Sequence, residues 1–316
     1  MMDRANPYEV AEAIGRLNVW KAAAANNWAL LPSDGSQWFV NVQEADMRGV
    51  KARMMFFAGW RPFHCFLITR QNHDFWVALS PADIPHVEVL FPESGPVQIV
   101  RYDEGYVQEP LGEDQRGIFA RMLYACFGFV MRVEGDPQLP MKFVSERALF
   151  ALKEDPDGRW SDCALPLPEK PPQFVEQVSL RKELLARAAD LPFDASFALE
   201  MDFGRVFHAQ TQEPRPRALY LCAAVDAKSG SRFLWRKMVV SGKPDGLLAL
   251  WQSLAQTLLE HIVAAGRVPG EIRVRSMRMV RFLRPLGMHL PFKLVVNSKL
   301  ALLDAEILSS IREGRL

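Results

Sequence analysis

The chain has 316 residues, of which 49% are hydrophobic and 24% are charged, and its formal net charge is +1. This balance is typical of a soluble globular protein. The length predicts two domains, because single cores usually stop growing at about 250–300 residues. No apolar run approaches the roughly 18–20 residues that a membrane-spanning helix needs. The first twenty residues form an amphipathic pattern that contains acids, which fits neither a secretory nor a transit peptide, so we expect a cytoplasmic protein.

Charge is divided unevenly between the two halves. Residues 1–170 contain 17 Lys and Arg against 23 Asp and Glu, a balance of −6, whereas residues 171–316 contain 21 against 14, a balance of +7. Such a difference is compatible with attraction between the halves and equally with a weakly nucleic-acid-binding second half. The charge pattern alone does not decide between the two.

The first half mixes helical and strand-like stretches. The apolar spacing of residues 7–25 predicts a helix with Pro7 near its start. A helix is also expected over 114–127 and a hairpin over 140–155. Between the two helices lie six β-rich runs, separated by turn-forming clusters, over residues 36–43, 53–60, 64–71, 75–80, 86–91 and 97–102. Strands this closely spaced favour a mostly antiparallel sheet, so residues 1–155 are predicted to form an α+β domain.

Residues 156–173 are rich in proline and are predicted to be a linker. Proline lacks the backbone donor that regular structure needs, and it stiffens a connecting segment. A helix is expected directly afterwards, over 174–189. It opens a second domain that covers residues 174–316.

The second domain has the clearer pattern. Three strands are predicted over 196–204, 218–225 and 233–240, and the second is nearly all apolar, as in a strand covered on both faces. The elements expected after them are a long helix ending at Gly266, a strand over 271–275, a helix over 277–286, a strand over 289–296 and a last helix over 300–311. This order predicts an α/β domain with a mixed five-stranded sheet.

Cysteine and histidine give no metal-binding pattern. The four cysteines form no Cys-x-x-Cys pair and are interpreted as reduced thiols. His64, His73 and His86 show no ligand spacing for zinc. No phosphate-binding glycine loop occurs either, so no cofactor is predicted from these residues.

Two stretches of the second half, PRALYLCAAVDAKSG at 216–230 and PGEIRVR at 269–275, carry a resemblance. They resemble a family of uncharacterised bacterial proteins, domains of unknown function, in which a helix-plus-sheet half precedes a module of this kind. More distantly, the same half resembles the integrase cores of the ribonuclease H-like group. The resemblance implies a ribonuclease H-like fold, in which Asp202 matches the first catalytic aspartate. Asp226 and Ser229 match only a turn.

The acidic metal site of that group is incomplete in this chain. Two-metal phosphodiester cleavage needs carboxylates from separate elements around ions about 3.5–4 Å apart. In the ribonuclease H-like group they lie on strand one, at the end of strand four and on a late helix. Asp202 fits the first place, and Asp304 or Glu306 fits the third. The second place falls at Arg275, whose permanent charge would repel a divalent cation.

The same positions predict an ion pair in place of the metal. Strand side chains alternate, so Glu200 and Asp202 share one face of their strand, and Arg273 and Arg275 share one face of theirs. The topology that the resemblance implies makes these strands neighbours. We therefore predict that Arg273 or Arg275 pairs with Glu200 or Asp202. The alternative is that all four side chains are solvated.

A second basic set consists of Arg236, Lys237, Arg278 and Arg281 and is a candidate for phosphate contacts. Arg278 and Arg281 lie three residues apart on one helix face, where a solvated charged surface is the commoner explanation. Nucleic-acid binding is thus an alternative that the sequence does not favour.

The sequence favours a non-catalytic binding or scaffold protein, a pseudo-nuclease without cofactor whose partner, such as another protein, is unidentified. The alternative is a magnesium-dependent nuclease that uses Asp202 with Asp304 or Glu306. A small-molecule enzyme with a pocket at the domain junction is a third alternative.

Overall fold

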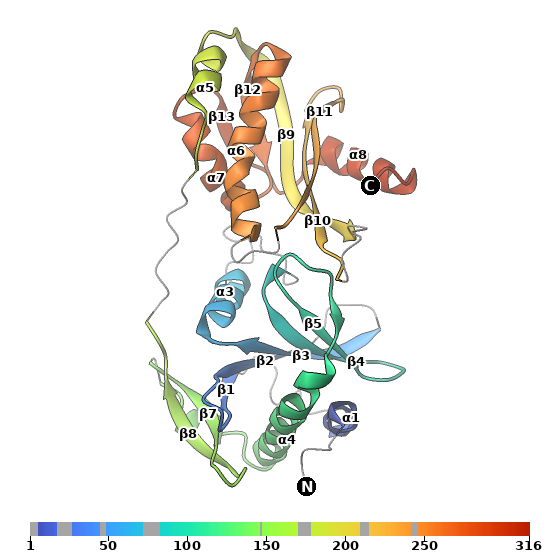
Figure 1. Ribbon diagram of the computed structural model, residues 1–316, viewed down its shortest axis with the longest axis vertical. Helices are drawn as coiled ribbons and strands as arrows, with labels where there is room; N and C mark the ends of the chain where they lie inside the picture. The colour runs from blue at the N-terminus through green and yellow to red at the C-terminus, as the bar shows by residue number, and fades with distance from the viewer. Residues whose placement is uncertain are drawn as a thin grey trace. The chain divides into compact units, whose positions relative to one another are not determined.

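The structure is a computed structural model that describes residues 6–17, 27–44, 49–71, 83–145, 147–169, 178–208, 215–241 and 246–316. The chain divides into two compact units, whose elements are labelled in Figure 1. Unit 1 comprises most of residues 1–172. Unit 2 comprises residues 173–316 together with residues 68–80 and 104–107.

Unit 1 contains an eight-stranded sheet. Its strands are β1 (Asn27–Leu31), β2 (Trp38–Glu44), β3 (Val50–Ala58), β4 (His86–Pro92), β5 (Gln98–Tyr102), β6 (Glu109–Pro110), β7 (Ala148–Glu154) and β8 (Trp160–Pro166). Their order across the sheet is β6-β5-β4-β3-β2-β1-β7-β8. These neighbours are antiparallel, except that β1 and β7 are parallel. The predicted α+β half with a mostly antiparallel sheet is confirmed.

Strand β8 corrects the prediction that residues 156–173 are a linker throughout. Residues 160–166 pair with β7 along its whole length. The turn between the two strands is closed by Asp155, whose Oδ1 accepts the backbone N–H of Arg159 at 2.8 Å, and Gly158 supplies a φ of +78°. Pro156 lies in this turn and Pro166 ends β8, so the proline-rich composition did not reveal the strand between them. The hairpin expected over 140–155 therefore lies at 148–166, and Pro140–Lys142 form a short 3-10 helix.

Helix α3 (Trp60–Gln71) corrects a second prediction, because residues 64–71 were expected to be a strand. Phe63 and Phe66 lie three residues apart and so share one side of the helix. Phe63 stacks on Phe39 with ring centroids 4.9 Å apart, and Phe66 stacks on Phe57 at 4.8 Å. Packing of this aromatic side against the sheet outweighs the strand propensity of the run. The strand predicted over 75–80 lies outside the described residues.

The two faces of the unit 1 sheet are covered by different helices (Figure 1). α1 (Pro7–Leu17) and α4 (Glu113–Gly135) form one hydrophobic core with Val40, Met54 and Phe56. Because side chains alternate along a strand, Phe39 and Phe57 point to the other face, where α3 lies. The helix predicted over 7–25 is described as far as Leu17, and the one predicted over 114–127 extends to Gly135.

His86 is held in a row of aromatic rings on the α3 face. Its ring stacks on Tyr102 of β5 with centroids 4.5 Å apart and lies 5.4 Å from the ring of Phe57 on β3. The Nδ1 atom is 2.7 Å from the carbonyl oxygen of Ile84. Burial lowers the pKa of His86 to about 4, so the imidazole is neutral at physiological pH.

Unit 2 contains a five-stranded mixed sheet. Its strands are β9 (Phe193–His208), β10 (Ala218–Asp226), β11 (Arg232–Val239), β12 (Val268–Val274) and β13 (Lys293–Val296). Their order is β11-β10-β9-β12-β13. β10 is antiparallel to β9 and β11, whereas β12 is parallel to β9 and β13. The prediction of a mixed five-stranded sheet with helices is confirmed.

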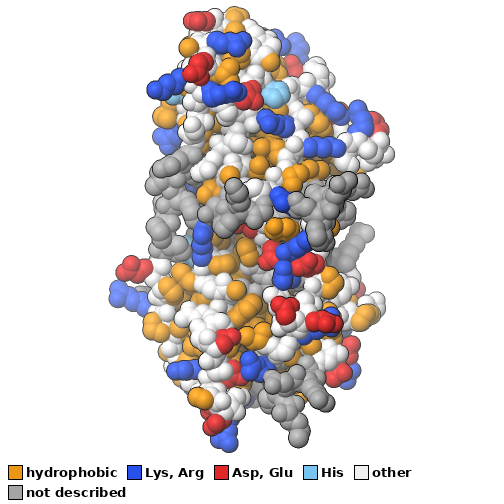
Figure 2. All heavy atoms as spheres, in the orientation of Figure 1, with side chains coloured by type: hydrophobic (Ala, Val, Ile, Leu, Met, Phe, Trp, Pro, Cys, Tyr) orange, Lys and Arg blue, Asp and Glu red, His pale blue; other side chains and the backbone are white. Residues whose placement is uncertain are grey.

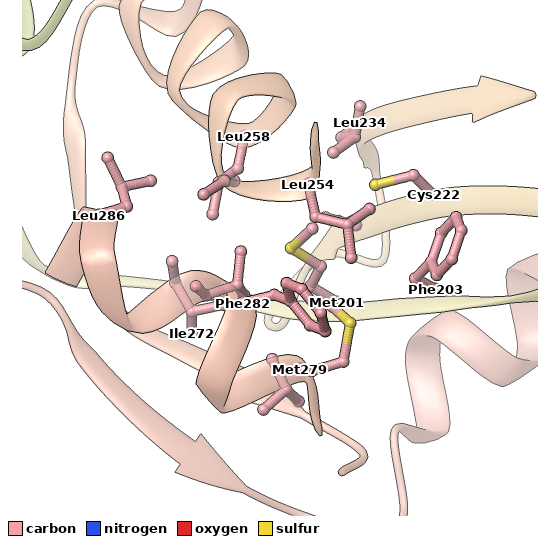
Figure 3. Packing of buried hydrophobic residues seen from close by; sticks show 14 of the residues in the cluster. Met201, Phe203, Cys222, Leu234, Leu254, Leu258, Ile272, Met279, Phe282 and Leu286 are labelled. Atoms are coloured by element: carbon pink, nitrogen blue, oxygen red, sulfur yellow. The ribbon is translucent and has the colours of Figure 1, made fainter. Parts of the chain in front are cut away.

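Helices cover both faces of this sheet (Figure 1). α5 (Lys182–Ala189), α6 (Gly246–Ala265) and α7 (Met277–Gly287) contribute to the larger core, in which Met201 and Ile272 meet Leu258 and Phe282 (Figure 3). α8 (Ala301–Arg312) lies on the opposite face, where a smaller cluster consists of Leu221, Ala223, Val225, Leu300 and Leu303.

The helix predicted over 174–189 starts later than expected, at Lys182. Residues 178–181 precede it without helical structure, and residues 174–177 lie outside the described part of the chain. Val178 and Leu180 nevertheless pack against the larger core. Their apolar character reflects that contact and not a continuation of the helix.

The cysteines Cys65, Cys126, Cys163 and Cys222 are free. Cys126 and Cys222 are buried, and burial raises the pKa of each thiol to about 12. Within the described ranges, no helix is both long enough and apolar enough to cross a membrane.

Candidate functional site

Arg275 lies at the centre of the site that the sequence predicts. It directly follows β12, and the next residue, Ser276, is the N-cap of α7. The Ser276 hydroxyl accepts the backbone N–H of Met279 at 3.3 Å, which is the usual way for a serine to begin a helix. A short connection between a buried strand and a capped helix therefore fixes the backbone of Arg275.

The guanidinium of Arg275 binds β9, α8 and the loop before α8. Its Nε donates to Oδ2 of Asp202 on β9 at 2.7 Å, and one Nη donates to the carbonyl oxygen of Ser298 at 2.8 Å. The other Nη donates to Oδ1 of Asp304 on α8 at 2.5 Å. The structure thus brings Asp202, Arg275 and Asp304 together, with every guanidinium nitrogen bonded to an oxygen.

The cluster is partly open to solvent. The exposed fractions of the side chains are 34% for Arg275, 23% for Asp202 and 46% for Asp304. Partial burial lowers the pKa of Arg275, but the bonds to Asp202 and then to Asp304 raise it by more, so its pKa lies above the ordinary value. The guanidinium is positively charged at every accessible pH.

Asp202 reaches this cluster because of the alternation along β9. Met201 and Phe203 point into the larger core, so Asp202 points to the face that carries α8. Its second carboxylate oxygen, Oδ1, accepts the backbone N–H of Phe203 at 2.9 Å. Both oxygens of Asp202 therefore accept hydrogen bonds from the protein.

Arg273, the other arginine predicted to pair, binds elsewhere. It lies opposite Glu200 in the parallel register of β9 and β12. Its Nε nevertheless donates to Glu271 at 2.6 Å, two residues away on the same strand. Of the four combinations that the sequence allowed, the structure contains the pair of Arg275 with Asp202.

Glu200 has a different role, which the sequence did not reveal. It is buried, and its Oε2 accepts the backbone N–H of Leu302 at 2.9 Å and of Leu303 at 3.0 Å. Leu300 occupies the N-cap position of α8 and offers no side-chain acceptor. Glu200 thus caps α8 from a neighbouring strand. The signal for this role was a helix preceded by leucine, whose first N–H groups need an acceptor from elsewhere.

Glu306 belongs to a separate cluster. Arg232 donates through Nε to its Oε1 at 2.7 Å and through an Nη to the hydroxyl of Ser310 at 2.7 Å. Residues two apart on a helix point in directions about 200° apart, which separates Glu306 from Asp304. Of the two candidates for a third ligand, Asp304 alone joins Asp202.

The four basic residues that were candidates for phosphate contacts do not form one surface. Arg236 and Lys237 are consecutive on β11 and so point to opposite faces of the sheet, with Arg236 3.6 Å from Glu260 on α6. Arg278 stacks over Trp251, 4.1 Å from the ring centroid. Arg281 is exposed on α7. Figure 2 likewise shows Lys and Arg side chains dispersed among acidic and hydrophobic ones on the visible face.

Asp226 and Ser229 form the turn that the resemblance suggested. Oδ1 of Asp226 accepts the backbone N–H groups of Lys228 at 2.8 Å and Ser229 at 2.9 Å. The bond from Ser229 is the chief reason why the pKa of Asp226 is lowered. The Ser229 hydroxyl accepts the backbone N–H of Ser231 at 3.3 Å, so both side chains serve the hairpin between β10 and β11.

The arrangement around Arg275 joins separate parts of unit 2. A guanidinium is neither a general base nor a metal ligand. In the part of the chain that the structure describes, no group of three His, Cys, Asp or Glu side chains is placed to hold a metal ion. The guanidinium of Arg275 bridges Asp202 and Asp304, and it thereby links β9, the end of β12 and α8.

One comparison with known proteins gives a match. Residues 184–310 match the model of a protein family described as a domain of unknown function, DUF6930. This stretch runs from α5 into α8 and contains Asp202, Arg275 and Asp304, so it agrees with the predicted similarity to an uncharacterised family. No curated protein and no solved structure matches the chain.

Proposed function

We propose that unit 2 is a ribonuclease H-like module whose metal site is replaced by an ion pair, and that the protein is a non-catalytic binding or scaffold protein. The strand order supports the fold. The first three strands of unit 2 form an antiparallel meander, and the fourth, β12, lies beside the first and parallel to it. The long helix α6 connects the third strand to the fourth.

The position of Arg275 is the main support for the proposed loss of catalysis. Asp202 on the first strand and Asp304 on the last helix occupy the places of two catalytic carboxylates of the ribonuclease H-like group. The place of the remaining one, after the fourth strand, holds Arg275. Its guanidinium binds both acids, at 2.7 Å and 2.5 Å.

Magnesium does not fit these residues. The ion requires oxygen ligands in near-octahedral geometry at about 2.0–2.1 Å. Both available acids are already bonded to a permanent cation, so a magnesium ion would have to displace the guanidinium and would then lie close to a like charge. These residues therefore favour a non-catalytic binding protein over a magnesium-dependent enzyme.

A magnesium-dependent nuclease is the alternative function. It would use Asp202 with Asp304 or Glu306, but Arg275 and Arg232 bind those last two side chains. Binding of nucleic acid without cleavage is also disfavoured, because Lys237 points to the opposite face of the sheet from Arg236, and Arg278 stacks on Trp251. A protein is the class of partner that we propose in its place.

Calorimetric titration with Mg²⁺ and Mn²⁺ tests the proposal, together with cleavage assays on single-stranded and double-stranded DNA and RNA. We expect no saturable heat and no metal-dependent cleavage for the intact chain, and the same result for Asp202→Ala. Glu271→Ala removes a carboxylate outside the cluster and controls for non-specific ion binding. Cleavage that is abolished by Asp202→Ala and kept by Glu271→Ala would establish the nuclease instead.

A further inference from the structure

Unit 1 contains a cavity of about 360 Å³ at one end of its sheet. The cavity is bordered by the start of β2 and of β4, by the ends of β3 and β5, and by the first half of α4. Cavities that bind small molecules in proteins span about 300–1,000 Å³. This one therefore has room for a small ring compound.

Most of the lining of the cavity is apolar. The apolar residues include Trp38, Val87, Leu111, Ile118, Phe119 and Met122. Val87, Leu111, Phe119 and Met122 belong to the main core of unit 1 and are at most 5% exposed. Because this core holds them in place, the cavity is preformed on the α4 side of the sheet and needs no rearrangement to accept a ligand.

Arg101, the basic group at the edge of the cavity, is already paired with carboxylates of the protein. Arg101 donates through Nε to Asp103 at 2.8 Å, and one Nη lies 2.8 Å from Asp103 and 2.9 Å from Glu109. The other Nη donates to Oε1 of Gln115 at 3.1 Å. An anionic ligand would have to compete with two carboxylates for this guanidinium, so the cavity is not built for a carboxylate or a phosphate.

Gln115 provides the polar contact for a ligand. Its carbonyl oxygen accepts the bond from Arg101, which fixes the orientation of the amide and leaves its NH₂ group as a donor. Gln115 lies in the first turns of α4 and lines the cavity beside Ile118 and Phe119. A ligand with an oxygen or nitrogen acceptor can be recognised there.

We propose that this cavity is a binding site for an uncharged, ring-sized apolar molecule that carries one hydrogen-bond acceptor. The walls supply the apolar contact area and Gln115 supplies the donor. The ion pairs of Arg101 with Asp103 and Glu109 select against charge, because an anion or a cation would have to compete with them. This site lies in unit 1 and is independent of the function proposed for unit 2.

Three probes of equal size and different charge test the proposal: acetophenone, benzoate and benzamidine. The measurement is the ¹³C-methyl resonance of Met122, assigned with Met122→Leu and followed by NMR during titration of the full chain. We expect acetophenone to shift this resonance saturably, with a dissociation constant on the order of 1 mM. Benzoate and benzamidine should bind at least about tenfold more weakly, because benzoate must compete with Asp103 and Glu109 for Arg101, and benzamidine must compete with Arg101 for those carboxylates.

Two variants locate the contact, and a third serves as control. Gln115→Glu keeps an acceptor for Arg101 but removes the amide donor, so it should weaken acetophenone about fivefold. Ile118→Trp should fill the cavity and abolish binding. Arg116→Ala, at an exposed position of the same helix, should leave binding unchanged.

Tighter binding of benzoate or benzamidine than of acetophenone would overturn the proposal. So would a Met122 resonance that none of the three probes moves up to 20-fold above the expected constant (~20 mM). Both outcomes are read from the wild-type chain and do not require that Ile118→Trp folds. Equal acetophenone binding by the wild type and Gln115→Glu would contradict the assigned donor.

Discussion

The carboxylate of Glu200 accepts the backbone N–H of Leu303 at 3.0 Å, which ties the first strand of unit 2 to its last helix. A carboxylate at this end of a helix satisfies N–H groups that have no partner within the helix, and it also interacts favourably with the helix dipole. Glu200 is 5% exposed, so water cannot replace it easily. The attachment of α8 therefore depends on one buried acid as well as on its small hydrophobic cluster.

Replacing Glu200 should loosen α8. Glu200→Gln keeps an acceptor oxygen and loses the charge, so we expect the free energy of unfolding to fall by about 0.5–1 kcal/mol. Glu200→Ala leaves the N–H groups of Leu302 and Leu303 without this acceptor and should cost about 2–3 kcal/mol. Urea unfolding gives these values, and amide hydrogen exchange should show faster exchange in α8. Glu271→Gln, at a partly exposed carboxylate, is the matched control, and equal losses for both acids would contradict the capping role.

Removing the arginine at the centre of the candidate site should cost little stability. The side chains of Arg275, Asp202 and Asp304 are all between 23% and 46% exposed, and ion pairs of this kind contribute at most about 1 kcal/mol. We expect Arg275→Ala to lower the free energy of unfolding by about 1 kcal/mol, and the difference to shrink in 1 M salt (Debye length ~3 Å). A loss of about 3–5 kcal/mol would instead indicate a fully buried pair.

Reversing the charge at the same position should create a metal site. Arg275→Asp places a third carboxylate beside Asp202 and Asp304, and three oxygen donors suit Mg²⁺ or Mn²⁺. We expect this variant to be less stable than the wild type without metal and to be stabilised by Mn²⁺, by about 1.4 kcal/mol at ten times the dissociation constant. Thermal unfolding with and without Mn²⁺ measures the effect. Arg275→Leu is the control and should show no such gain, and a gain of the same size in that variant would refute the assignment.

His86 should make the stability of unit 1 depend on pH. The pKa is about 6.5 in the unfolded chain and about 4 in the folded protein, so between these values the unfolded state binds the extra proton. The stabilising contribution is complete above pH 6.5 and decreases as the pH falls toward 4. At pH 5 we expect about 2 kcal/mol less stability than at pH 7 from this group.

His86→Phe isolates that contribution, because it keeps a ring between Phe57 and Tyr102 and removes the titration. Urea unfolding of wild type and variant at pH 5, 6 and 7 should give curves that diverge toward low pH. Burial raises the pKa of the neighbouring Glu88, which acts in the opposite direction but is present in both proteins. Parallel curves would show that the imidazole is not the group responsible.

Local patterns predicted the elements of unit 2 better than those of unit 1. A turn separates β10 from β11, and one amphipathic helix separates β11 from β12 and another β12 from β13. Such signals depend on neighbouring residues only. In unit 1, the aromatic residues of α3 favour a strand by local propensity. Their packing against Phe39 and Phe57 on the sheet, which the local sequence does not show, explains the helix. β1 was not predicted, because it is five residues long and pairs on one side with the distant β7. Its partner cannot be read from periodicity.

Some contacts of the candidate site were likewise predictable from the sequence, and others were not. The proximity of Asp202 and Arg275 follows from side-chain alternation on two strands that the implied topology places side by side. The choice of Asp304 over Glu306, the carbonyl of Ser298 and the capping by Glu200 depend on where α8 rests on the sheet. A few contacts, including those of Leu300 and Leu303, determine that position, and no sequence pattern specifies them.

The parallel pairing of β1 with β7 has a consequence for how the chain is made. Ala29 meets Ala151 in that register, so one edge of β1 has no strand to pair with until synthesis has passed residue 151. An unpaired strand edge binds strands of other chains readily. We therefore expect nascent or truncated chains that end before β7 to self-associate through β1, whose edge the β7–β8 hairpin covers in the finished sheet.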